Sequence, residues 1–337
     1  MITVVGTGSW GTTLAVVLAR SGHETVLLAR SQAEAAELRA RAENRRFLPG
    51  IPLPPQLLLT ASAEEAMGRA RMVLLVVPAQ KMRAQLAALR QHLPPEAVYV
   101  SCAKGLELPS GRRMSEVIRE ELGQAAASQT AALSGPNLAA EVARGLPTAT
   151  VVAAPDEQVA RFVQQNLAIP RLRVYTNTDL LGVELAGALK NIIAVGAGIC
   201  DGLGFGDNAK AAFLTRGLAE IARLGLALGA NPLTFAGLAG VGDLMATCAS
   251  RLSRNRYVGE ELGKGRSLAE IQAEMTMVAE GVPTTAAAKQ LAESLRVEMP
   301  ITEKMFAVLF AGASPREAVG ELMMRDRKDE LDGIIRR

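Results

Sequence analysis

The sequence contains few of the residues on which several classes of protein depend. Its three cysteines, Cys102, Cys200 and Cys248, lie far apart and without Cys-x-x-Cys spacing. We therefore expect neither a disulfide framework nor a zinc site, and no other metal site is predicted. The two histidines, His23 and His92, fall in expected turns, so we interpret them as structural. A reducing compartment fits this composition.

Aromatic residues and charge of one sign are also scarce. Aromatics make up 3% of the chain, while Ala, Leu and Gly are plentiful. This favours packed helices and a parallel sheet over an all-β sandwich. The chain has 37 basic and 34 acidic residues in a mixed distribution, with a net charge of +3. We therefore expect no nucleic-acid partner, although the arginines at 251–256 can bind a small anion.

No segment has the pattern of a signal peptide or a membrane span. The chain begins with MITVVGTGSWG, without a basic segment followed by a long apolar run. The most apolar helical stretches contain Lys190, Asn191 and Asp201, or Arg216 and Glu220. Such polar residues argue against a span, so the sequence predicts a cytoplasmic protein.

The first half of the chain alternates apolar runs with helical stretches. Strands are predicted at 2–5, 25–29, 72–77, 97–102, 131–134, 148–153 and 172–176. Continuous apolar strands between helices indicate a parallel sheet covered on both faces. From about Leu180 helical patterns dominate. The sequence therefore predicts an α/β chain, with a Rossmann-like, doubly wound dinucleotide-binding domain at 1–177 and an all-helical substrate-binding and catalytic domain at 178–337.

A glycine-rich loop follows the first predicted strand. In VVGTGSWGTTLA, Gly6, Gly8 and Gly11 form a G-x-G-x-x-G pattern that opens a helix. Glycine allows a tight turn and a close backbone approach, and the helix N-terminus favours a pyrophosphate. A purely structural glycine turn is the alternative, but the strand before the loop and the strand at 25–29 favour dinucleotide binding.

The end of the second strand bears on which dinucleotide binds. An NAD site normally places Asp or Glu there, about 20 residues after the loop, to hold the ribose hydroxyls. This chain instead has LLARS, and Arg30 can bind a 2′-phosphate. NADP(H) is therefore predicted as the preferred cofactor, with NAD(H) possible. The alternative is that Arg30 is a solvated loop charge.

Lys190 lies in the apolar stretch ELAGALKNIIAVGAG. Its neighbours on one helical stripe, such as Ala186, Ala194 and Gly198, are small, so another helix or a ligand approaches there. Taken alone, such a lysine more often extends its amine to water. Lys104, however, follows a strand, where ligands of open α/β sheets bind. Burial and a second lysine would lower the pKa of Lys190, so its amine could act as a general base.

A second polar stretch, SRLSRNRYVG, suits the binding of an anion. It places a hydroxyl, a guanidinium and an amide next to one another, at Ser253, Arg254 and Asn255. A solvated basic helix is the alternative. The preceding LAGVGDLMATC contains Asp243 and Thr247, and its glycines let the backbone approach a ligand. Asp243 could accept a hydrogen bond from a substrate hydroxyl or orient a lysine.

These motifs, in this order, resemble bacterial-type NAD(P)-dependent glycerol-3-phosphate dehydrogenase over essentially the whole chain. The string GALKNIIAVGAGICDGLGFGDN is the most specific match; GTGSWGTTLA, SCAKGLE, SGPNLAAEVARGLPTA, VGDLMATC, SRLSRNR and AEGVPT also match. The resemblance implies reduction of dihydroxyacetone phosphate to sn-glycerol 3-phosphate for phospholipid synthesis, and a homodimer. It also implies that Lys190 is the proton acceptor.

The resemblance further implies two sets of binding residues. The substrate set is Lys104, Gly135, Asn137, Lys190, Asn191, Asp243, Thr247, Ser253, Arg254 and Asn255. The dinucleotide set is Gly6, Gly8, Ser9, Trp10, Gly11, Arg30, Lys104, Ala139, Arg254, Val278 and Glu280. Asn137 departs from the family, which usually has Ser or Thr after SGP.

Two other functions are compatible with parts of the pattern. A reductase of 2-keto or 3-hydroxy acids can also combine such a nucleotide domain with a helical domain and a lysine. A non-catalytic redox sensor would keep the glycine loop and would have no need for Lys190. The residues at 253–255 discriminate only weakly between phosphate and carboxylate substrates.

Overall fold

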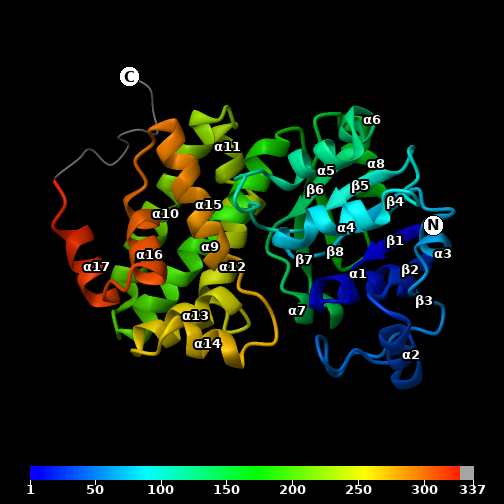
Figure 1. The fold of residues 1–337 in the computed structure, drawn as a ribbon, viewed down its shortest axis with the longest axis horizontal. Coiled ribbons are helices and arrows are strands. Elements are labelled where there is room, and N and C mark those ends of the chain that lie inside the picture. Colours follow the sequence, from blue (N-terminus) through cyan, green and yellow to red (C-terminus); the bar gives the residue numbers. More distant parts are fainter. Residues whose placement is uncertain (327–337) are drawn as a thin grey trace. The chain divides into compact units, whose positions relative to one another are not determined.

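The computed structural model describes residues 1–326, which form two compact units (Figure 1). The first unit contains Met1–Ala103 and Met114–Leu180, and the second contains Lys104–Arg113 and the chain from Leu181 onward. The sequence-based boundary at residue 177 left Lys104–Arg113 in the first domain. In the structure this segment packs with the second unit.

An eight-stranded sheet forms the centre of the first unit, in the order β3-β2-β1-β4-β5-β6-β7-β8. The strands are β1 (Ile2–Val5), β2 (Thr25–Leu28), β3 (Leu58–Thr60), β4 (Met72–Leu75), β5 (Val98–Ser101), β6 (Thr130–Ser134), β7 (Thr148–Ala153) and β8 (Leu172–Asn177). All neighbours pair in parallel except β6 and β7, which are antiparallel. The prediction of a parallel sheet is therefore wrong at this one pairing, and it also missed β3.

Helices cover both faces of the sheet, because its central strands are apolar on both sides. The helices of this unit are α1 (Ser9–Arg20), α2 (Gln32–Arg41), α3 (Ala63–Met67), η1 (Ala79–Lys81), α4 (Met82–Leu89), α5 (Met114–Leu122), α6 (Gln124–Ser128), α7 (Ala139–Ala143) and α8 (Glu157–Leu167). One core joins α1 and α8 to residues such as Val4 and Leu74. The other joins α3, α4 and α5 to alternate residues such as Val5 and Leu75.

In the described residues from Leu181 onward, the second unit consists of helices and the loops that connect them. Its elements are α9 (Leu180–Gly202), α10 (Asp207–Ala227), α11 (Pro232–Phe235), η2 (Leu238–Gly242), α12 (Asp243–Ala249), α13 (Arg254–Gly263), α14 (Leu268–Glu274), α15 (Gly281–Leu295), α16 (Pro300–Phe310) and α17 (Pro315–Met323). The element η2 is a π-helical turn that leads directly into α12. The predicted α/β domain followed by helices is confirmed.

The segment Lys104–Arg113 is fixed to α9 at both ends. Arg113 Nη1 lies 2.7 Å from Oε2 of Glu184, whose side chain is 7% exposed. At the other end, Asn191 Nδ2 donates to the carbonyl of Lys104 at 2.8 Å. These contacts place Lys104 against the helix that also carries Lys190.

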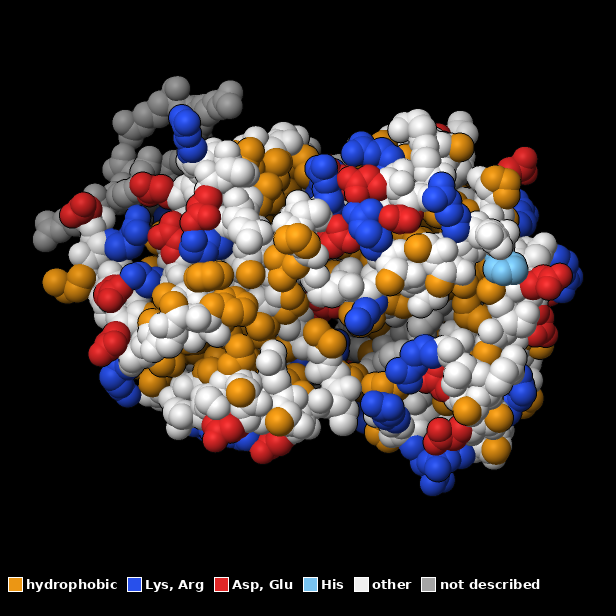
Figure 2. All heavy atoms as spheres, viewed as in Figure 1, with side chains coloured by type: hydrophobic (Ala, Val, Ile, Leu, Met, Phe, Trp, Pro, Cys, Tyr) orange, Lys and Arg blue, Asp and Glu red, His pale blue; other side chains and the backbone are white. Residues whose placement is uncertain are grey.

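Two stretches have the length and hydropathy of a membrane span: Leu180–Gly202 and Pro232–Ala249. The most apolar window of the first is 89% buried inside the protein. The second is broken into α11, η2 and α12 and contains the buried Asp243. The first stretch therefore belongs to the core of the helical unit, whereas the window of the second is 44% buried. Figure 2 shows basic and acidic side chains mainly around the edge of this unit's visible face, with hydrophobic side chains over its centre.

Candidate active site

The glycine loop after β1 has a backbone that only glycine tolerates. Gly6 has a φ of +115°, and a Cβ there would lie 2.4 Å from the carbonyl oxygen of Val76. A Cβ on Gly11 would lie 1.9 Å from the carbonyl oxygen of Gly6. The loop therefore folds tightly between β1, β4 and the start of α1, as the G-x-G-x-x-G spacing predicted.

The N-terminus of α1 suits a pyrophosphate. Gly8 is the N-cap, no side chain caps the helix, and its first turn contains no acidic residue. Ser9 and Trp10 begin the helix, and the indole Nε1 of Trp10 is buried with no hydrogen-bond partner among residues 1–326. Amide groups at a helix N-terminus attract anions, so these residues fit a dinucleotide.

Arg30 is paired with a carboxylate that the sequence analysis overlooked. Its guanidinium Nε lies 3.1 Å from both carboxylate oxygens of Glu34, Nη2 also contacts Oε1, and its backbone N–H donates to Oε2 at 2.8 Å. Thr7, in the glycine loop, donates to Glu34 Oε1 at 2.9 Å. Burial alone would raise the pKa of Glu34, but these hydrogen bonds outweigh it and lower the pKa below its usual value. Arg30 is thus a largely exposed charge that is also held by Glu34.

Asn44 is a second residue that sequence reasoning missed. Its buried Nδ2 donates to the carbonyl of Thr7 and to Oγ1 of Thr12, both at 2.8 Å. Thr12 Oγ1 in turn donates to the Thr7 carbonyl at 3.1 Å. Asn44 therefore holds the glycine loop against α1. In the sequence it stands in AENRRF, which has the composition of an ordinary loop.

The SGPNLA stretch follows β6 in the same unit. Gly135 has a φ of +130°, and a Cβ there would lie 3.1 Å from Cα of Thr150 on β7. Ala139 begins α7, and its carbonyl accepts a hydrogen bond from Thr13 Oγ1 of α1 at 3.1 Å. Asn137 lies between them and is partly buried. Ala139 is thus joined to α1 and Gly135 lies against β7, and all three predicted residues belong to the first unit.

Lys190 is buried in the second unit beside two polar residues of α12. Its side chain is 6% exposed, and Nζ donates to Oγ1 of Thr247 at 2.5 Å. Nζ also lies 3.2 Å from Oδ1 of Asp243, which accepts from Thr247 Oγ1 at 3.1 Å. Asp243 and Thr247 are four residues apart on α12, so both face α9. The reading in which Lys190 extends to water is excluded by this burial.

Asp243 also binds the second lysine. Lys104 Nζ lies 2.7 Å from its other carboxylate oxygen, Oδ2. Burial alone would raise the pKa of Asp243, but the two ammonium groups outweigh it and lower the pKa below its usual value. One buried carboxylate is therefore shared between Lys104 and Lys190.

The pKa of Lys190 is lowered to about 8. Burial is the largest cause, because it disfavours the charged ammonium. The carboxylate of Asp243 opposes this shift, and the charge of Lys104 adds to it. Both predicted causes, burial and Lys104, thus act in the predicted direction. An amine with this pKa can hold or release a proton near neutral pH.

A chain of side-chain amides connects Lys104 with α13 and α15. Asn191 donates to the Lys104 carbonyl and accepts, through Oδ1, from Asn255 Nδ2 at 2.8 Å. Asn255 Oδ1 accepts from the backbone N–H of Gly281 at 2.9 Å. Because these donors and acceptors pair in only one orientation, the chain fixes the start of α13 relative to Lys104.

The remaining predicted residues lie at the starts of α13 and α15. Ser253 is the N-cap of α13, and its Oγ accepts from the Arg256 N–H at 3.2 Å. Arg254 is exposed, and its Nη1 donates to the carbonyl of Val278 at 2.7 Å. Glu280 immediately precedes α15. The N-terminus of α13 therefore carries the guanidinium of Arg254, and the segment before α15 contacts it through Val278.

The small-residue stripe beside Lys190 lies against another helix at Gly198. A Cβ on Gly198 would lie 2.0 Å from the carbonyl oxygen of Arg256, and one on Gly259 would lie 1.8 Å from that of Val195. These glycines thus let α13 pack backbone to backbone against α9. Of the two alternatives predicted for the stripe, another helix is the one found at Gly198.

The glycines of LAGVGDL also have a packing role. A Cβ on Gly240 would lie 1.9 Å from the carbonyl oxygen of Phe235. Gly240 therefore allows the π-helical turn η2 to fold against α11 and thereby sets the start of α12. The expected close approach of backbone to ligand is here an approach of backbone to backbone.

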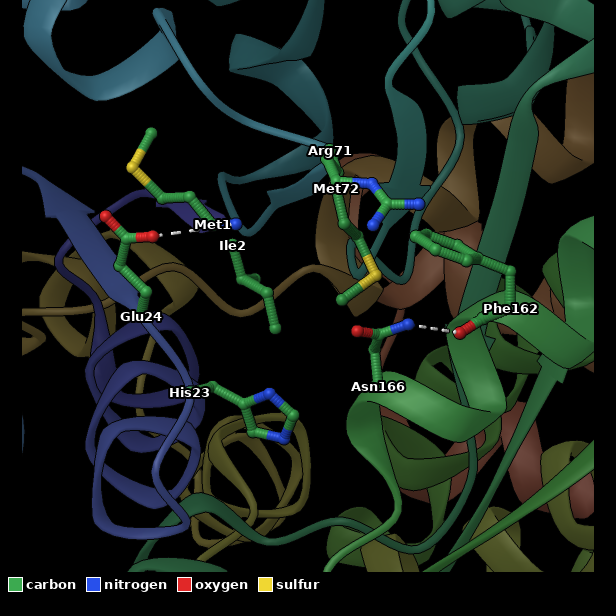
Figure 3. A pocket seen from close by; sticks show the side chains of 8 residues that line it. All are labelled: Met1, Ile2, His23, Glu24, Arg71, Met72, Phe162 and Asn166. Carbon is green, nitrogen blue, oxygen red and sulfur yellow. Dashed lines mark hydrogen bonds and ion pairs between the residues drawn. The ribbon is translucent and has the colours of Figure 1, made fainter.

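A separate small cavity lies at the amino ends of β1 and β4, away from the glycine loop, which follows the carboxyl end of β1 (Figure 3). It has a volume of about 90 Å³ and is lined by Met1, Ile2, His23, Glu24, Arg71, Met72, Phe162 and Asn166. Arg71 lies over the Phe162 ring, and Asn166 donates to the Phe162 carbonyl. This cavity contains none of the predicted site residues.

Comparison with known proteins identifies the family. The N-terminal and C-terminal models of NAD-dependent glycerol-3-phosphate dehydrogenase match residues 1–160 and 179–320. The NAD(P)+ glycerol-3-phosphate dehydrogenase of Citrifermentans bemidjiense is 52% identical over 329 residues, which cover 98% of each protein. That of Desulfitobacterium hafniense is 50% identical, over 99% of this chain and 94% of its own.

A solved structure agrees with these matches. The crystal structure of glycerol-3-phosphate dehydrogenase from Coxiella burnetii has a TM-score of 0.91 and 38% identity, over 96% of this chain and 98% of its own. The similarity extends through both units, so the glycine loop and the lysine cluster occur within one shared framework. The chain is an oxidoreductase that belongs to the NAD(P)-dependent glycerol-3-phosphate dehydrogenase family.

Proposed function

We propose that this chain transfers hydride reversibly between NAD(P)H and dihydroxyacetone phosphate, giving sn-glycerol 3-phosphate, with Lys190 as the general acid and base. The observation that carries the proposal is the buried amine of Lys190, whose pKa is about 8. It contacts Thr247 and Asp243 within a shared cluster. The nicotinamide supplies the hydride chemistry when bound.

The proton is handled at Nζ of Lys190. In reduction, the ammonium donates a proton to the developing alkoxide oxygen; in oxidation, the neutral amine removes the hydroxyl proton. Thr247 and Asp243 hold Nζ in one position through short contacts. Because Asp243 also binds Lys104, the cluster carries two ammonium groups and one carboxylate when both lysines are protonated. That excess positive charge favours a phosphorylated substrate.

The substrate phosphate is proposed to bind at the start of α13. There Ser253, Arg254 and Asn255 supply a hydroxyl, a guanidinium and an amide beside a helix N-terminus. Lys104, Asn191, Asp243 and Thr247 complete the proposed set in this unit. Gly135 and Asn137 are proposed to contribute from the other unit, where Asn137 replaces the hydroxyl residue usual in the family.

The cofactor is proposed to bind the glycine loop and the start of α1, with NADP(H) preferred over NAD(H). Arg30 supports that preference as a cation for the 2′-phosphate. Ser9, Trp10 and Ala139 are proposed as further contacts from the first unit, and Lys104, Arg254, Val278 and Glu280 from the second.

The cellular role is proposed to be the supply of glycerol 3-phosphate for glycerophospholipids, in the cytoplasm and as a homodimer. The family membership supports these assignments, and sedimentation velocity of the purified chain tests the dimer. A monomer across the working concentration range would contradict that part of the proposal.

The decisive experiment measures oxidation of NADPH and NADH with dihydroxyacetone phosphate, beside 2-keto and 3-hydroxy acids. We expect turnover of the phosphate substrate only. Lys190→Ala should lower kcat by at least about 100-fold while NADPH still binds in calorimetry. Lys264→Ala, an exposed lysine of the same unit, is the control and should keep wild-type turnover.

Three outcomes would overturn the proposal. Turnover of hydroxy acids without dihydroxyacetone phosphate would identify a reductase of the competing class. Unchanged turnover in Lys190→Ala would show that Lys190 is not the general acid and base. Cofactor binding without any turnover in the wild type would instead favour a redox sensor.

A further inference from the structure

The geometry points to Glu34 as the residue that sets the choice between NADH and NADPH. This inference rests on the proposed function, because it concerns the cofactor of that reaction. An NAD-selective Rossmann site has an acidic residue at the end of the second strand. Here β2 ends at Leu28 and is followed by Ala29 and Arg30, so no acid stands at that position.

The first turn of α2 supplies the missing carboxylate. Ser31 caps this helix by accepting from the Glu34 N–H at 3.2 Å, which directs the Glu34 side chain back towards β2. Its Oε1 then accepts from Thr7 of the glycine loop at 2.9 Å. The carboxylate is thus fixed between the loop that binds the pyrophosphate and the arginine that follows β2.

Glu34 and Arg30 favour different cofactors. A carboxylate accepts hydrogen bonds from the ribose hydroxyls of NAD(H) and repels the 2′-phosphate of NADP(H). The guanidinium of Arg30 binds that phosphate, but Glu34 engages its Nε and Nη2. To bind NADP(H), Arg30 must therefore turn its N–H donors from the Glu34 carboxylate to the 2′-phosphate, or share them between these two anions.

The surroundings allow Arg30 to make this exchange. The Arg30 side chain is 59% exposed, whereas that of Glu34 is 16% exposed and more firmly held. Arg30 Cζ lies 5.8 Å from the ring centre of Phe47, and Arg46 Cζ lies 4.9 Å from it. Because an aromatic ring attracts a cation on its face, Phe47 can support Arg30 when its donors turn to a phosphate.

The test compares Glu34→Gln with the wild type by calorimetric titration of NADH and NADPH, without substrate. Gln keeps the size of the side chain and removes its charge. We expect the ratio of the NADH to the NADPH dissociation constant to rise about tenfold, through weaker NADH and tighter NADPH binding. Glu37→Gln is the matched control, because Glu37 lies on α2 and pairs only with the exposed Arg41 in the described structure.

A second variant tests the same inference with the charge in place. Thr7→Val removes only the hydrogen bond between the loop and Glu34, and we expect a smaller change of the ratio in the same direction. An unchanged ratio in both variants, or equal weakening of both cofactors, would overturn the inference. If the wild type bound neither cofactor, the proposed function itself would fail, so the two failures are distinguishable.

Discussion

Lys190 shows how one side chain acquires a chemical property from its neighbours. Burial lowers its pKa, Asp243 raises it, and Lys104 lowers it further, which leaves a value of about 8. Lys104 acts in two ways, because it adds a positive charge and also occupies Oδ2 of Asp243. Removal of Lys104 would therefore leave the Asp243 carboxylate paired with Lys190 alone, which would raise the pKa of Lys190.

The activity of the chain should depend on pH through this amine. In the proposed mechanism, reduction needs the Lys190 ammonium, so kcat/KM for dihydroxyacetone phosphate should fall as the pH rises through about 8. Oxidation of glycerol 3-phosphate needs the neutral amine, so its kcat/KM should rise through the same pH. Lys104→Met should move both inflections to higher pH, which pH profiles of kcat/KM in the two directions would measure. Inflections that stay in place would show that Lys104 does not set this pKa.

The sequence was informative for residues whose chemistry is unusual where they stand. A lysine in an apolar helix and an SRN triplet after a glycine turn could both be predicted as candidate site residues from the sequence alone. Glu34 and Asn44 did not, because acidic residues and amides are common at helix starts and in loops. Only the fold brings Glu34 to Thr7, 27 residues earlier, and Asn44 to the same residue, 37 residues earlier.

The start of α16 depends on a residue of another helix. Its N-cap, Met299, supplies no side-chain hydrogen bond. Glu220 of α10 replaces the cap, because its carboxylate accepts from the N–H groups of Ile301 at 2.5 Å and Thr302 at 3.2 Å. Despite these donors, burial raises the pKa of Glu220 to about 7. The contact thus joins two helices through a titratable group.

The stability of the protein should reflect Glu220. Its pKa is about 7 in the folded state against 4.5 for an ordinary glutamate, so the stability from its protonated form is fully present below pH 4.5. That contribution is lost as the pH rises through 7, by about 3 kcal/mol. Glu220→Gln should remove this loss, and urea unfolding at acidic and alkaline pH would measure it. Glu293→Gln, an exposed carboxylate, is the control; equal pH dependence in both variants would contradict the assignment.

The packing of α13 on α9 depends on glycine. Gly259→Ala would place a methyl group 1.8 Å from the Val195 carbonyl oxygen, so the two helices must separate. We expect this overpacking to lower the free energy of unfolding by about 1–3 kcal/mol or more. Gly320→Ala lies in the exposed part of α17 with nothing within 4 Å, and it should leave stability unchanged or slightly higher. Denaturant unfolding compares the two, and equal stabilities would refute the close packing.

The sheet shows what residue patterns predict and what they omit. The seven predicted strands are present because each is a run of apolar or β-branched residues. The missed strand, β3, is a three-residue edge strand that begins with the half-exposed Leu58. The antiparallel direction of β7 has no local signal, because an apolar strand has the same composition in either direction.

The chain passes between the two units three times, after Ala103, after Arg113 and after Leu180. The segment Lys104–Arg113 belongs to the helical unit. There Lys104 pairs with Asp243, and Arg113 pairs with Glu184. A single boundary at residue 177 therefore does not separate two independent domains, although strand and helix patterns alone suggest one.

A fragment of residues 178–337 should not unfold cooperatively when expressed alone. It would lack Arg113, which pairs with Glu184, and Lys104, one of the two lysines that pair with Asp243. Leaving a buried charge uncompensated costs up to about 3–5 kcal/mol. Circular dichroism during urea titration would measure this. Coexpression with residues 1–177 supplies the missing segment and is the control. A cooperative transition of the isolated fragment would refute the dependence on Lys104–Arg113.

The shared carboxylate of Asp243 also has a consequence for biosynthesis. Lys104 and Asp243 are separated by 139 residues, so during translation the lysine leaves the ribosome long before its partner. The strands of the first unit are complete by Asn177, while Lys190 and α12 follow later. Because domains tend to form as they are synthesised, we infer that the sheet forms first and the lysine cluster forms among the last contacts. A nascent chain stalled before α12 would therefore contain a folded first unit, while Lys190 would lack its contacts with Asp243 and Thr247.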